Sequence, residues 1–164
     1  MTKRIAICAG SFDPPTFGHL NIIERGLKIF DTLIVAVATN TSKSSILTVE
    51  DRVELLRELL KDHKGIEVTS FEGLLVDFAK QKNIMTLLRG IRTMSDYEYE
   101  QQMALVNKAL YPSLETVFMM TEGQYSHLRS TFIREILLSD GSCKGMIHPL
   151  VEKKLKKSLR GISF

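Results

Sequence analysis

Cysteine is scarce in this chain, which contains Cys8 and Cys143 and no further member of that residue type. Two cysteines cannot form the disulfide framework that holds small secreted proteins together. Cys8 lies within an apolar run, where a thiol is expected to behave as a small buried hydrophobe. At 164 residues, the chain is long enough to bury a core without disulfides or a structural metal. We therefore expect reduced thiols and a cytoplasmic location.

Long hydrophobic runs are also missing, and no run reaches the length of a membrane span. The first residues, Met-Thr-Lys-Arg-Ile-Ala-Ile-Cys, hold too short an apolar stretch for a secretory signal peptide. We see no low-complexity segment, internal repeat or obvious linker in the sequence. We therefore expect a single domain over residues 1–164 that does not associate with membranes.

The chain has no long block of lysine and arginine, although its formal net charge is +3. Its densest basic segment lies near the C-terminus, where Val151, Leu155 and Leu159 form an apolar stripe. The solvated face opposite that stripe is expected to carry Lys153, Lys154, Lys156 and Lys157. Such a mild positive charge fits a small anionic ligand at least as well as nucleic acid, and we expect no nucleic-acid partner.

Short apolar runs alternate with segments of helical periodicity along the chain. Strands are predicted at residues 4–9, 32–38, 66–71, 84–88 and 115–120. Helices are predicted at residues 18–30, 49–60, 73–82, 95–110, 130–138 and 149–159. The strands are continuously apolar, which is typical of parallel strands that are buried on both faces. The predicted fold is therefore α/β, a doubly wound five-stranded parallel sheet with helices on both faces.

Individual side chains mark the starts and the inner faces of the predicted helices. Thr48 is a suitable N-cap for the helix that begins at residue 49. Ser95 followed by Glu98 is a capping-box pattern and predicts the start of the helix at 95–110. In the helix at 73–82, three apolar side chains are expected to face the core: Leu74, Leu75 and Phe78.

The loops that follow the strands carry the candidate site residues, because parallel α/β sheets bind ligands beyond the carboxyl ends of their strands. The first loop reads Gly-Ser-Phe-Asp-Pro-Pro-Thr-Phe-Gly-His, from Gly10 to His19. Gly10 allows a sharp turn and a close approach to a ligand. Gly18 opens a helix whose free N–H groups attract phosphate, and His19 follows in its first turn. A lone Gly-His pair is more often structural, whereas the combined pattern after an N-terminal strand is specific.

Three further loops bring cations and hydroxyl groups to the same edge of the predicted sheet. Lys43 follows the second strand, and its alternative interpretation is a solvated surface lysine. Arg89 and Arg92 flank a glycine after the fourth strand, which suits bidentate phosphate binding better than a surface ion pair. Ser130 and Thr131 begin a helix, where they serve either as an anion site or as a simple N-cap.

The combined set of side chains contains no Cys/His metal cluster and no nucleophile paired with a base. This set of cations and phosphate-binding groups suits a reaction whose main obstacle is negative charge on the reactants, and not the activation of a bond. The segment from Thr16 to His19 resembles the (H/T)-x-G-H signature of the nucleotidyltransferase superfamily. Three further features narrow the resemblance to one family of this superfamily: the Arg-Gly-Ile-Arg segment at 89–92, the Asp-Tyr-Glu-Tyr-Glu segment at 96–100, and Asn107. Over essentially the whole chain, the sequence resembles the phosphopantetheine adenylyltransferase family.

This resemblance implies a Rossmann-like nucleotidyltransferase fold and a specific reaction. ATP and 4′-phosphopantetheine would give dephospho-coenzyme A and pyrophosphate, which is the penultimate step of coenzyme A synthesis. The resemblance also implies Mg²⁺ carried with ATP, a homohexamer, and coenzyme A as a feedback inhibitor. It offers no protein cage for the metal.

The resemblance further implies roles for individual residues. Catalysis is expected to use His19, Lys43 and Arg92. Binding of 4′-phosphopantetheine is expected to use Ser11, Lys43, Leu75, Arg89 and Asn107. Binding of ATP is expected to use Ser11, Phe12, His19, Gly90, Ile91, Arg92, Glu100, Tyr125, Ser126, His127, Leu128, Arg129, Ser130 and Thr131.

The chain departs from the common family pattern in three places. Cys8 and Ala9 stand where an aromatic residue and proline are usual, and Phe17 replaces an asparagine. Arg129 lies in a run that is usually serine-rich, so it either adds a phosphate contact or points to solvent. Two alternatives stay open: a nucleotidylyltransferase for nicotinamide mononucleotide or glycerol phosphate, and a non-catalytic nucleotide-binding regulator.

Overall fold

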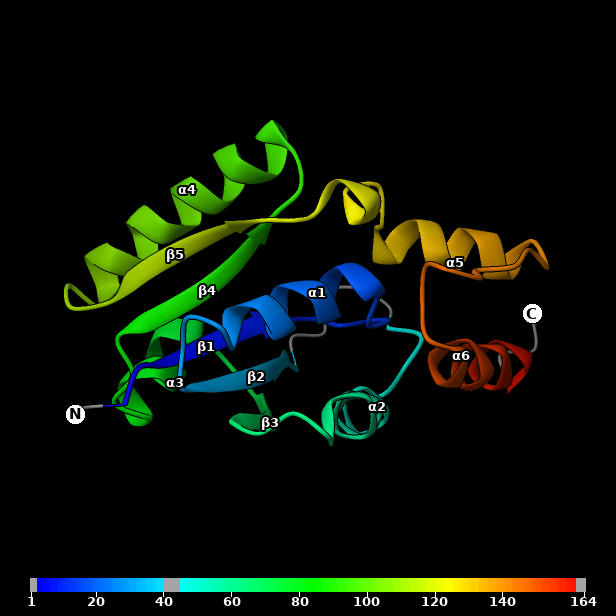
Figure 1. The fold of residues 1–164 in the computed structure, drawn as a ribbon, viewed down its shortest axis with the longest axis horizontal. Helices are drawn as coiled ribbons and strands as arrows, with labels where there is room; N and C mark the ends of the chain where they lie inside the picture. The colour runs from blue at the N-terminus through cyan, green and yellow to red at the C-terminus, as the bar shows by residue number, and fades with distance from the viewer. Residues whose placement is uncertain (1–2, 40–44, 162–164) are drawn as a thin grey trace.

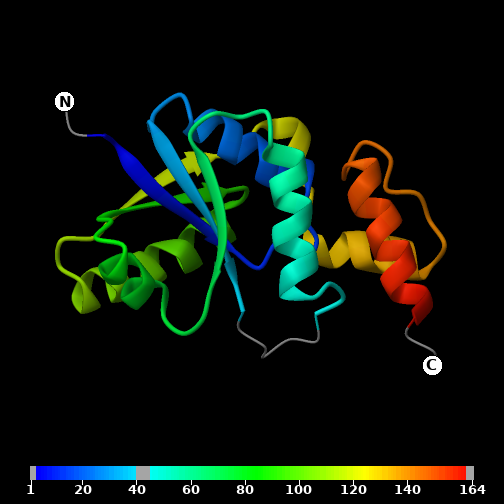
Figure 2. The ribbon, with the colours of Figure 1, turned by 90° about the horizontal axis from the view of Figure 1, so that it is seen from below.

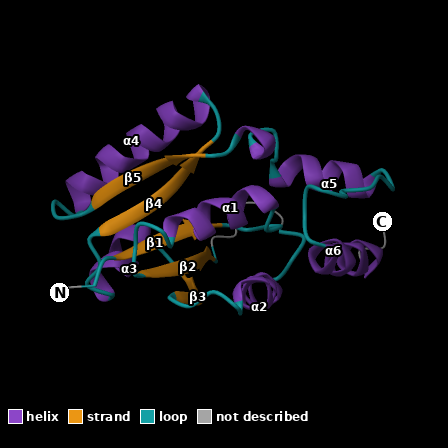
Figure 3. Ribbon diagram, in the orientation of Figure 1, coloured by secondary structure: helices purple, strands orange, loops and turns teal. Residues whose placement is uncertain are grey.

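The computed structural model describes residues 3–39 and 45–161, with side chains up to residue 159. Its sheet consists of β1 (Ile5–Gly10), β2 (Thr32–Ala38), β3 (Ile66–Phe71), β4 (Thr86–Ile91) and β5 (Glu115–Met120). The strand order is β3-β2-β1-β4-β5, and every pair is parallel, as the arrows in Figure 3 show. This confirms the predicted sheet, and β2, β3 and β5 have the predicted bounds.

Helices cover both faces of this sheet, as predicted (Figures 1 and 2). One face carries α1 (Phe17–Gly26) and α2 (Val49–Leu60), and the other carries α3 (Leu75–Gln81) and α4 (Met94–Leu110). Beyond β5 follow a short 3-10 helix, η1 (Gly123–Tyr125), then α5 (Ser130–Leu138) and α6 (Pro149–Gly161). None of the described helices is long and apolar enough to cross a membrane.

The core is made of two layers because β1 and β2 are buried on both sides. Ala6 and Cys8 of β1 pack toward α1 and α2, whereas Ile7 and Ala9 pack toward α3. The burial of consecutive side chains explains why these strands are continuously apolar in sequence. Cys8 is buried, as expected for a small hydrophobe.

A third apolar cluster joins the two C-terminal helices to α2, beyond the carboxyl ends of the strands (Figure 1). It contains Leu47, Leu55, Ile133, Leu137, Cys143, Ile147, Val151 and Leu155. Val151 and Leu155 belong to the stripe predicted for the terminal helix, and both are fully buried. The helix α5 is thereby fixed at the edge of the sheet where ligands bind in such folds.

The first helix is shorter than predicted, because it ends at Gly26 instead of continuing to residue 30. A Cβ atom at Gly26 would lie 2.5 Å from Leu88 Cδ2 and 2.8 Å from Leu33 Cδ1. The end of the helix thus lies directly against the sheet, and a side chain at position 26 would force the ends of both leucine side chains to shift. Phe30 is still buried, but it reaches the core from the turn that follows.

The fourth strand was predicted at 84–88 but spans Thr86–Ile91. Arg89, Gly90 and Ile91 pair with Phe118, Met119 and Met120 of β5, so the strand continues through polar and small residues. Arg89 and Gly90 are consequently strand residues, and only Arg92 lies in the loop beyond. The sequence pattern could not reveal this, because the extension depends on pairing with a strand that is distant in sequence.

Two further local predictions were wrong. The N-cap of α4 is Thr93, whose hydroxyl accepts a hydrogen bond from the Asp96 N–H at 3.2 Å, and it is not Ser95. Leu74 is 58% exposed, because it is the extended residue before α3 and does not face the core. The N-cap role of Thr48 is confirmed by a 3.1 Å hydrogen bond from the Asp51 N–H to its hydroxyl.

Candidate active site

A cavity of about 430 Å³ opens where the strand order reverses, between the carboxyl ends of β1 and β4. A crevice at such a switch point is the usual ligand site of doubly wound sheets, and this volume suits a small molecule. The predicted site residues among its walls are Ser11, Phe12, His19, Arg89, Gly90, Arg92, Glu100, Leu128, Arg129, Ser130 and Thr131. Loops that are far apart in sequence therefore converge on one edge of the sheet, as predicted.

The His19 ring is held at the start of α1 by Thr16, the N-cap residue. The Thr16 backbone N–H donates to His19 Nδ1 at 3.0 Å, and the Thr16 hydroxyl also lies 3.0 Å from Nδ1. The His19 N–H in turn approaches the Thr16 hydroxyl oxygen at 3.4 Å, which completes a capping box. Because Nδ1 accepts a backbone hydrogen bond, the proton of the neutral ring lies on Nε2.

The charge state of His19 is set by its surroundings. Burial lowers the pKa of His19 from 6.5 to about 4, and the positive charges of Arg92 and Arg89 act in the same direction. The imidazole is therefore neutral at pH 7 and donates through Nε2–H. Phe12, which is 2% exposed, supports the ring through an edge contact with centroids 5.1 Å apart.

The close packing of this loop explains the glycine at its start. A Cβ atom at Gly10 would lie 3.2 Å from the Phe12 ring, which itself packs on His19. Phe12 also has a backbone φ of 47°, in the left-handed region that non-glycine residues rarely adopt. Phe12 thus contributes to the site mainly as a buried support for the histidine.

Arg89 is already bound within the protein. Its Nε and Nη2 donate to Glu100 Oε2 and Oε1 at 2.8 and 2.6 Å, and Nη1 donates to the Ala9 carbonyl. Burial alone lowers the pKa of Arg89, but the hydrogen bonds and the charge of Glu100 outweigh it and raise the pKa. Arg89 and Glu100, which were predicted to bind different substrates, thus form one ion pair at the wall of the cavity.

Arg92 connects two loops of the site. Its Nε and Nη2 donate to Asp96 Oδ2 and Oδ1 at 2.8 and 3.2 Å, and its Nη1 donates to the Leu128 carbonyl at 2.9 Å. The start of α4 is thereby joined to the loop before α5. Arg89 and Arg92 therefore each have a carboxylate partner that fixes the orientation of the guanidinium group.

The start of α5 forms the opposite wall. The N-cap residue, Arg129, makes no side-chain hydrogen bond to the helix, and the uncapped start of a helix is a place that favours an anion. The Arg129 guanidinium lies over the Phe132 ring, 5.7 Å from its centroid, and Arg129 lines the cavity. Ser130 donates its hydroxyl hydrogen to the Pro14 carbonyl at 3.0 Å, which fastens this wall to the first loop.

Several predicted site residues lie outside the cavity. Ile91 is 1% exposed in the core, and the Ser126 hydroxyl donates to the Gly123 carbonyl. Residues that also do not line the cavity are Leu75, Asn107, Tyr125 and His127. Lys43 falls within residues 40–44, outside the part of the chain that the structure describes. The roles assigned to these residues stay predictions.

Sequence reasoning missed several residues of the wall and its supports. Apolar and small wall residues such as Ile22 and Leu88 carry no recognisable signal, because they resemble core residues. Thr16 did carry one, since it stands three residues before His19, the spacing of an N-cap and its capping-box partner. Arg52, buried to 3% exposure, stands on the apolar stripe of α2, where a charged residue is unusual.

The fold resembles solved nucleotidyltransferase structures. A crystal structure from Vibrio parahaemolyticus, named as a candidate nicotinate-nucleotide adenylyltransferase, superposes with a TM-score of 0.70. The superposition covers 94% of this chain and 99% of the Vibrio parahaemolyticus chain. Because the two sequences are only 20% identical, the likeness concerns the fold. A family model described as cytidylyltransferase-like matches residues 7–136 of the sequence.

Curated relatives identify the family more closely. The phosphopantetheine adenylyltransferase of Carboxydothermus hydrogenoformans is 47% identical over 157 residues, covering 96% of this chain and 97% of the relative. The enzyme of the same name from Caldanaerobacter subterraneus subsp. tengcongensis is 45% identical and covers 96% of this chain and 98% of the relative. That of Syntrophus aciditrophicus is 47% identical and covers 94% of both chains. The chain therefore belongs to the phosphopantetheine adenylyltransferase family.

Proposed function

We propose that the cavity between β1, β4 and α5 is where this adenylyltransferase joins ATP to 4′-phosphopantetheine, giving dephospho-coenzyme A and pyrophosphate. The observation that carries the proposal is the neutral His19, whose Nε2–H is the free donor of the ring, beside two arginines at the switch point of the sheet. Family membership supplies the reaction, and this geometry supports the assignment of the site.

The chemical step needs no general base. A phosphate oxygen of 4′-phosphopantetheine is already anionic at pH 7 and attacks the α-phosphorus of ATP. One P–O bond forms there, and the bond from the α-phosphorus to the bridging oxygen breaks as pyrophosphate leaves with that electron pair. Because both reactants are anions, catalysis consists of alignment and electrostatic stabilisation.

His19 would donate its Nε2–H to a non-bridging oxygen of the α-phosphate, where negative charge builds up in the transition state. A neutral donor is suited to this task, because it keeps its proton throughout the reaction. Loss of one such donor costs about 2.7–4 kcal/mol of transition-state stabilisation in comparable sites. The hydrogen bond from the Thr16 N–H to Nδ1 fixes both the tautomer and the orientation of the ring, so the ring need not reorient during the reaction.

The two ends of the cavity would bind different phosphates. The ATP phosphates would lie near Arg92, Arg129 and the uncapped start of α5. The incoming phosphate would lie near Arg89, with Ser11 between the two substrates. Lys43 is proposed as a second ligand of the incoming phosphate from its sequence position alone.

Mg²⁺ is proposed to arrive with ATP and not to be held by a protein cage. Glu100, which lines the cavity, and Asp96, which binds Arg92, are both engaged in ion pairs with arginines. Among the described residues, no group of three His, Cys, Asp or Glu side chains could hold a metal ion. This donor set does not fit a resident metal, and hydrated Mg²⁺ on substrate phosphates needs no such set.

We further propose that a second copy of the chain covers α4 in a homohexamer. This helix has no buried residue, and Tyr99, Leu105 and Val106 are 63%, 66% and 52% exposed. Apolar exposure on this scale is usual at interfaces between copies. Coenzyme A contains both the pantetheine part and the adenylyl part of dephospho-coenzyme A, and it is proposed to compete with the substrates for the cavity.

A cytoplasmic location is also proposed, and the free, buried thiols of Cys8 and Cys143 fit it.

The reverse reaction tests the proposed function. The enzyme is incubated with dephospho-coenzyme A, radiolabelled pyrophosphate and Mg²⁺, and labelled ATP is separated and counted. We expect labelled ATP to form from dephospho-coenzyme A, but neither labelled ATP from nicotinamide adenine dinucleotide nor labelled CTP from CDP-glycerol. Labelled triphosphate from either of the latter would assign a different acceptor, and binding without any exchange would refute catalysis.

A further inference from the structure

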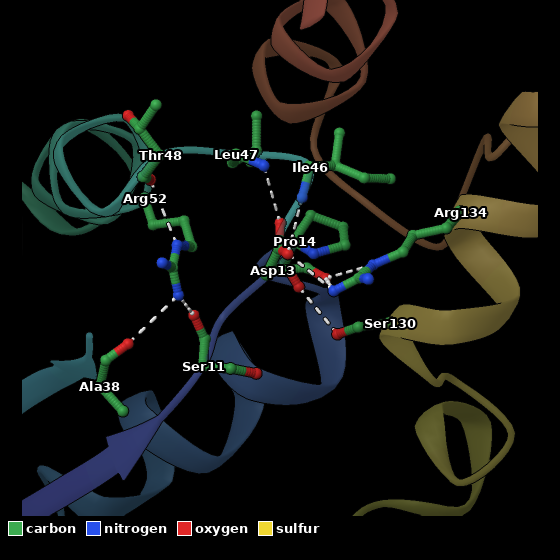
Figure 4. A network of polar contacts seen from close by, with 10 residues as sticks. All are labelled: Ser11, Asp13, Pro14, Ala38, Ile46, Leu47, Thr48, Arg52, Ser130 and Arg134. Atoms are coloured by element: carbon green, nitrogen blue, oxygen red, sulfur yellow. Dashed lines mark hydrogen bonds and ion pairs between the residues drawn. The ribbon is translucent and has the colours of Figure 1, made fainter. Parts of the chain in front are cut away.

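A buried polar cluster lies next to the cavity but contributes no side chain to its wall (Figure 4). Its centre is Asp13 in the first loop, which is 1% exposed. Arg134 of α5 binds the Asp13 carboxylate, and Arg52 of α2 binds the backbone of the same loop at Ser11. We call Asp13, Arg52 and Arg134 the Asp13 cluster.

Asp13 gathers contacts from two other segments. Its Oδ1 and Oδ2 accept hydrogen bonds from the Leu47 and Ile46 N–H groups, both at 3.1 Å. Oδ2 also accepts from Arg134 Nη2 at 2.7 Å. The carboxylate therefore ties the first loop to the segment before α2 and to α5. A buried carboxylate with this number of partners is well compensated for its lost hydration.

Arg134 contacts the backbone of the same loop. Its Nε and Nη2 donate to the Asp13 carbonyl at 3.0 and 2.9 Å, in addition to the bond to the carboxylate. Only the planar fork of arginine provides these contacts together. One turn earlier on α5, the Ser130 hydroxyl donates to the Pro14 carbonyl. The start of α5 is thus fastened to two consecutive residues of the first loop.

Arg52 fixes the other side of the loop. Its Nη1 donates to the Ser11 carbonyl at 2.7 Å and to the Ala38 carbonyl at 3.3 Å, and its Nε donates to the Thr48 carbonyl at 3.2 Å. The backbone of Ser11, whose side chain lines the cavity, is therefore attached to the end of β2 and to the start of α2.

We propose that Asp13, Arg52 and Arg134 are positioning residues, which hold the loop that carries Ser11 and leads into His19 of α1 at a fixed distance from the N-terminus of α5. The two walls proposed to bind the phosphates pack into different apolar clusters: the start of α1 packs on the sheet, and α5 packs in the C-terminal cluster. None of the three side chains lines the cavity, so they act through the residues that do. The inference rests on the proposed function, because its consequence is the alignment of the two substrates.

The test replaces the fork of Arg134 and keeps its charge. Arg134→Lys retains a cation near Asp13 but cannot bond the carbonyl and the carboxylate together. The dissociation constant for ATP is measured by calorimetry, and kcat and both KM values by steady-state assay, per mole of folded enzyme. We expect ATP affinity to fall and KM for ATP to rise roughly tenfold, the size of one lost charged hydrogen bond. The KM for 4′-phosphopantetheine is expected to change less.

The matched control is Arg4→Lys. Arg4 forms a similar two-pronged ion pair with Asp31, through Nε at 3.3 Å and Nη2 at 3.0 Å, but at the amino-terminal edge of the sheet. This variant is expected to keep wild-type kcat, KM and ATP affinity. A second test variant, Arg52→Lys, weakens the hold on the Ser11 carbonyl and is expected to lower kcat roughly tenfold.

The outcomes separate positioning from simple support of the fold. Weaker ATP binding in Arg134→Lys, with Arg4→Lys unchanged, supports the inference. A lower melting temperature with wild-type ATP affinity, KM and kcat in Arg134→Lys overturns it. If Arg134→Lys does not fold, Arg52→Lys decides alone, and wild-type kcat in that variant overturns the inference. Failure of the wild-type enzyme to form labelled ATP would instead refute the proposed function, independently of any variant.

Discussion

The low pKa of His19 makes stability depend on pH in a defined direction. In the folded protein the pKa of His19 is about 4, and in the unfolded chain it returns toward 6.5. Between these two pH values the unfolded chain binds a proton that the folded protein does not, so acid favours unfolding. The stabilisation is fully present above pH 6.5 and is lost as the pH falls to about 4. This difference corresponds to about 3 kcal/mol.

The variant His19→Asn isolates this contribution. The side-chain oxygen of the introduced asparagine can accept the Thr16 N–H in place of Nδ1, but an amide does not titrate. The free energy of unfolding is measured by urea denaturation at several pH values between 4 and 7. The other histidines are common to both proteins, so the difference between the two curves reports His19.

The expected result is a difference in slope. Near pH 5, the stability of the wild type should fall by about 1 kcal/mol per pH unit more than that of His19→Asn. A constant offset is also expected, because the variant loses the ring contact with Phe12, and that offset carries no information on the pKa. Parallel curves between pH 4 and 7 would show that His19 titrates normally and would refute the conclusion that its surroundings lower its pKa.

Three further variants test other parts of the site and its support. His19→Ala should lower kcat roughly 10²–10³-fold with little change in the KM values, and near-normal turnover would contradict its role as donor. Glu100→Gln leaves the partly buried Arg89 without its counter-charge and should reduce the free energy of unfolding by about 2 kcal/mol, measured by urea denaturation. An unchanged midpoint would contradict the importance of that pair. Leu155→Ala, at a fully buried position of the C-terminal cluster, should cost about 2–5 kcal/mol in the same assay. A loss well under 1 kcal/mol would show that α6 contributes little to holding α5.

The architecture was predictable from the sequence because the sheet is parallel and buried. β2 reads as a continuous apolar run because it is buried on both faces, and the bounds of β2 and β5 were predicted correctly. The end of β4 was not predictable, since Arg89 and Gly90 belong to the strand only through pairing with β5. The end of α1 depended on how closely Gly26 approaches Leu33 and Leu88, which no local pattern contains.

The sequence predicted which loops meet at the candidate site, but it did not predict which side chains bind one another there. The rule that ligands bind beyond strand ends brought His19, Arg92 and Ser130 together correctly. The ion pair between Arg89 and Glu100 was missed, because it depends on how α4 lies against β4. Arg52 was missed for a related reason, since its partners are carbonyl groups, which leave no trace in a sequence.

The histidine owes its tautomer to a main-chain amide and not to a replaceable side chain. The Thr16 N–H that binds Nδ1 would be present for any residue at that position except proline. This accounts for a signature that accepts either histidine or threonine three residues before its final histidine. A change at position 16 can therefore loosen the start of α1 while Nε2 keeps its hydrogen.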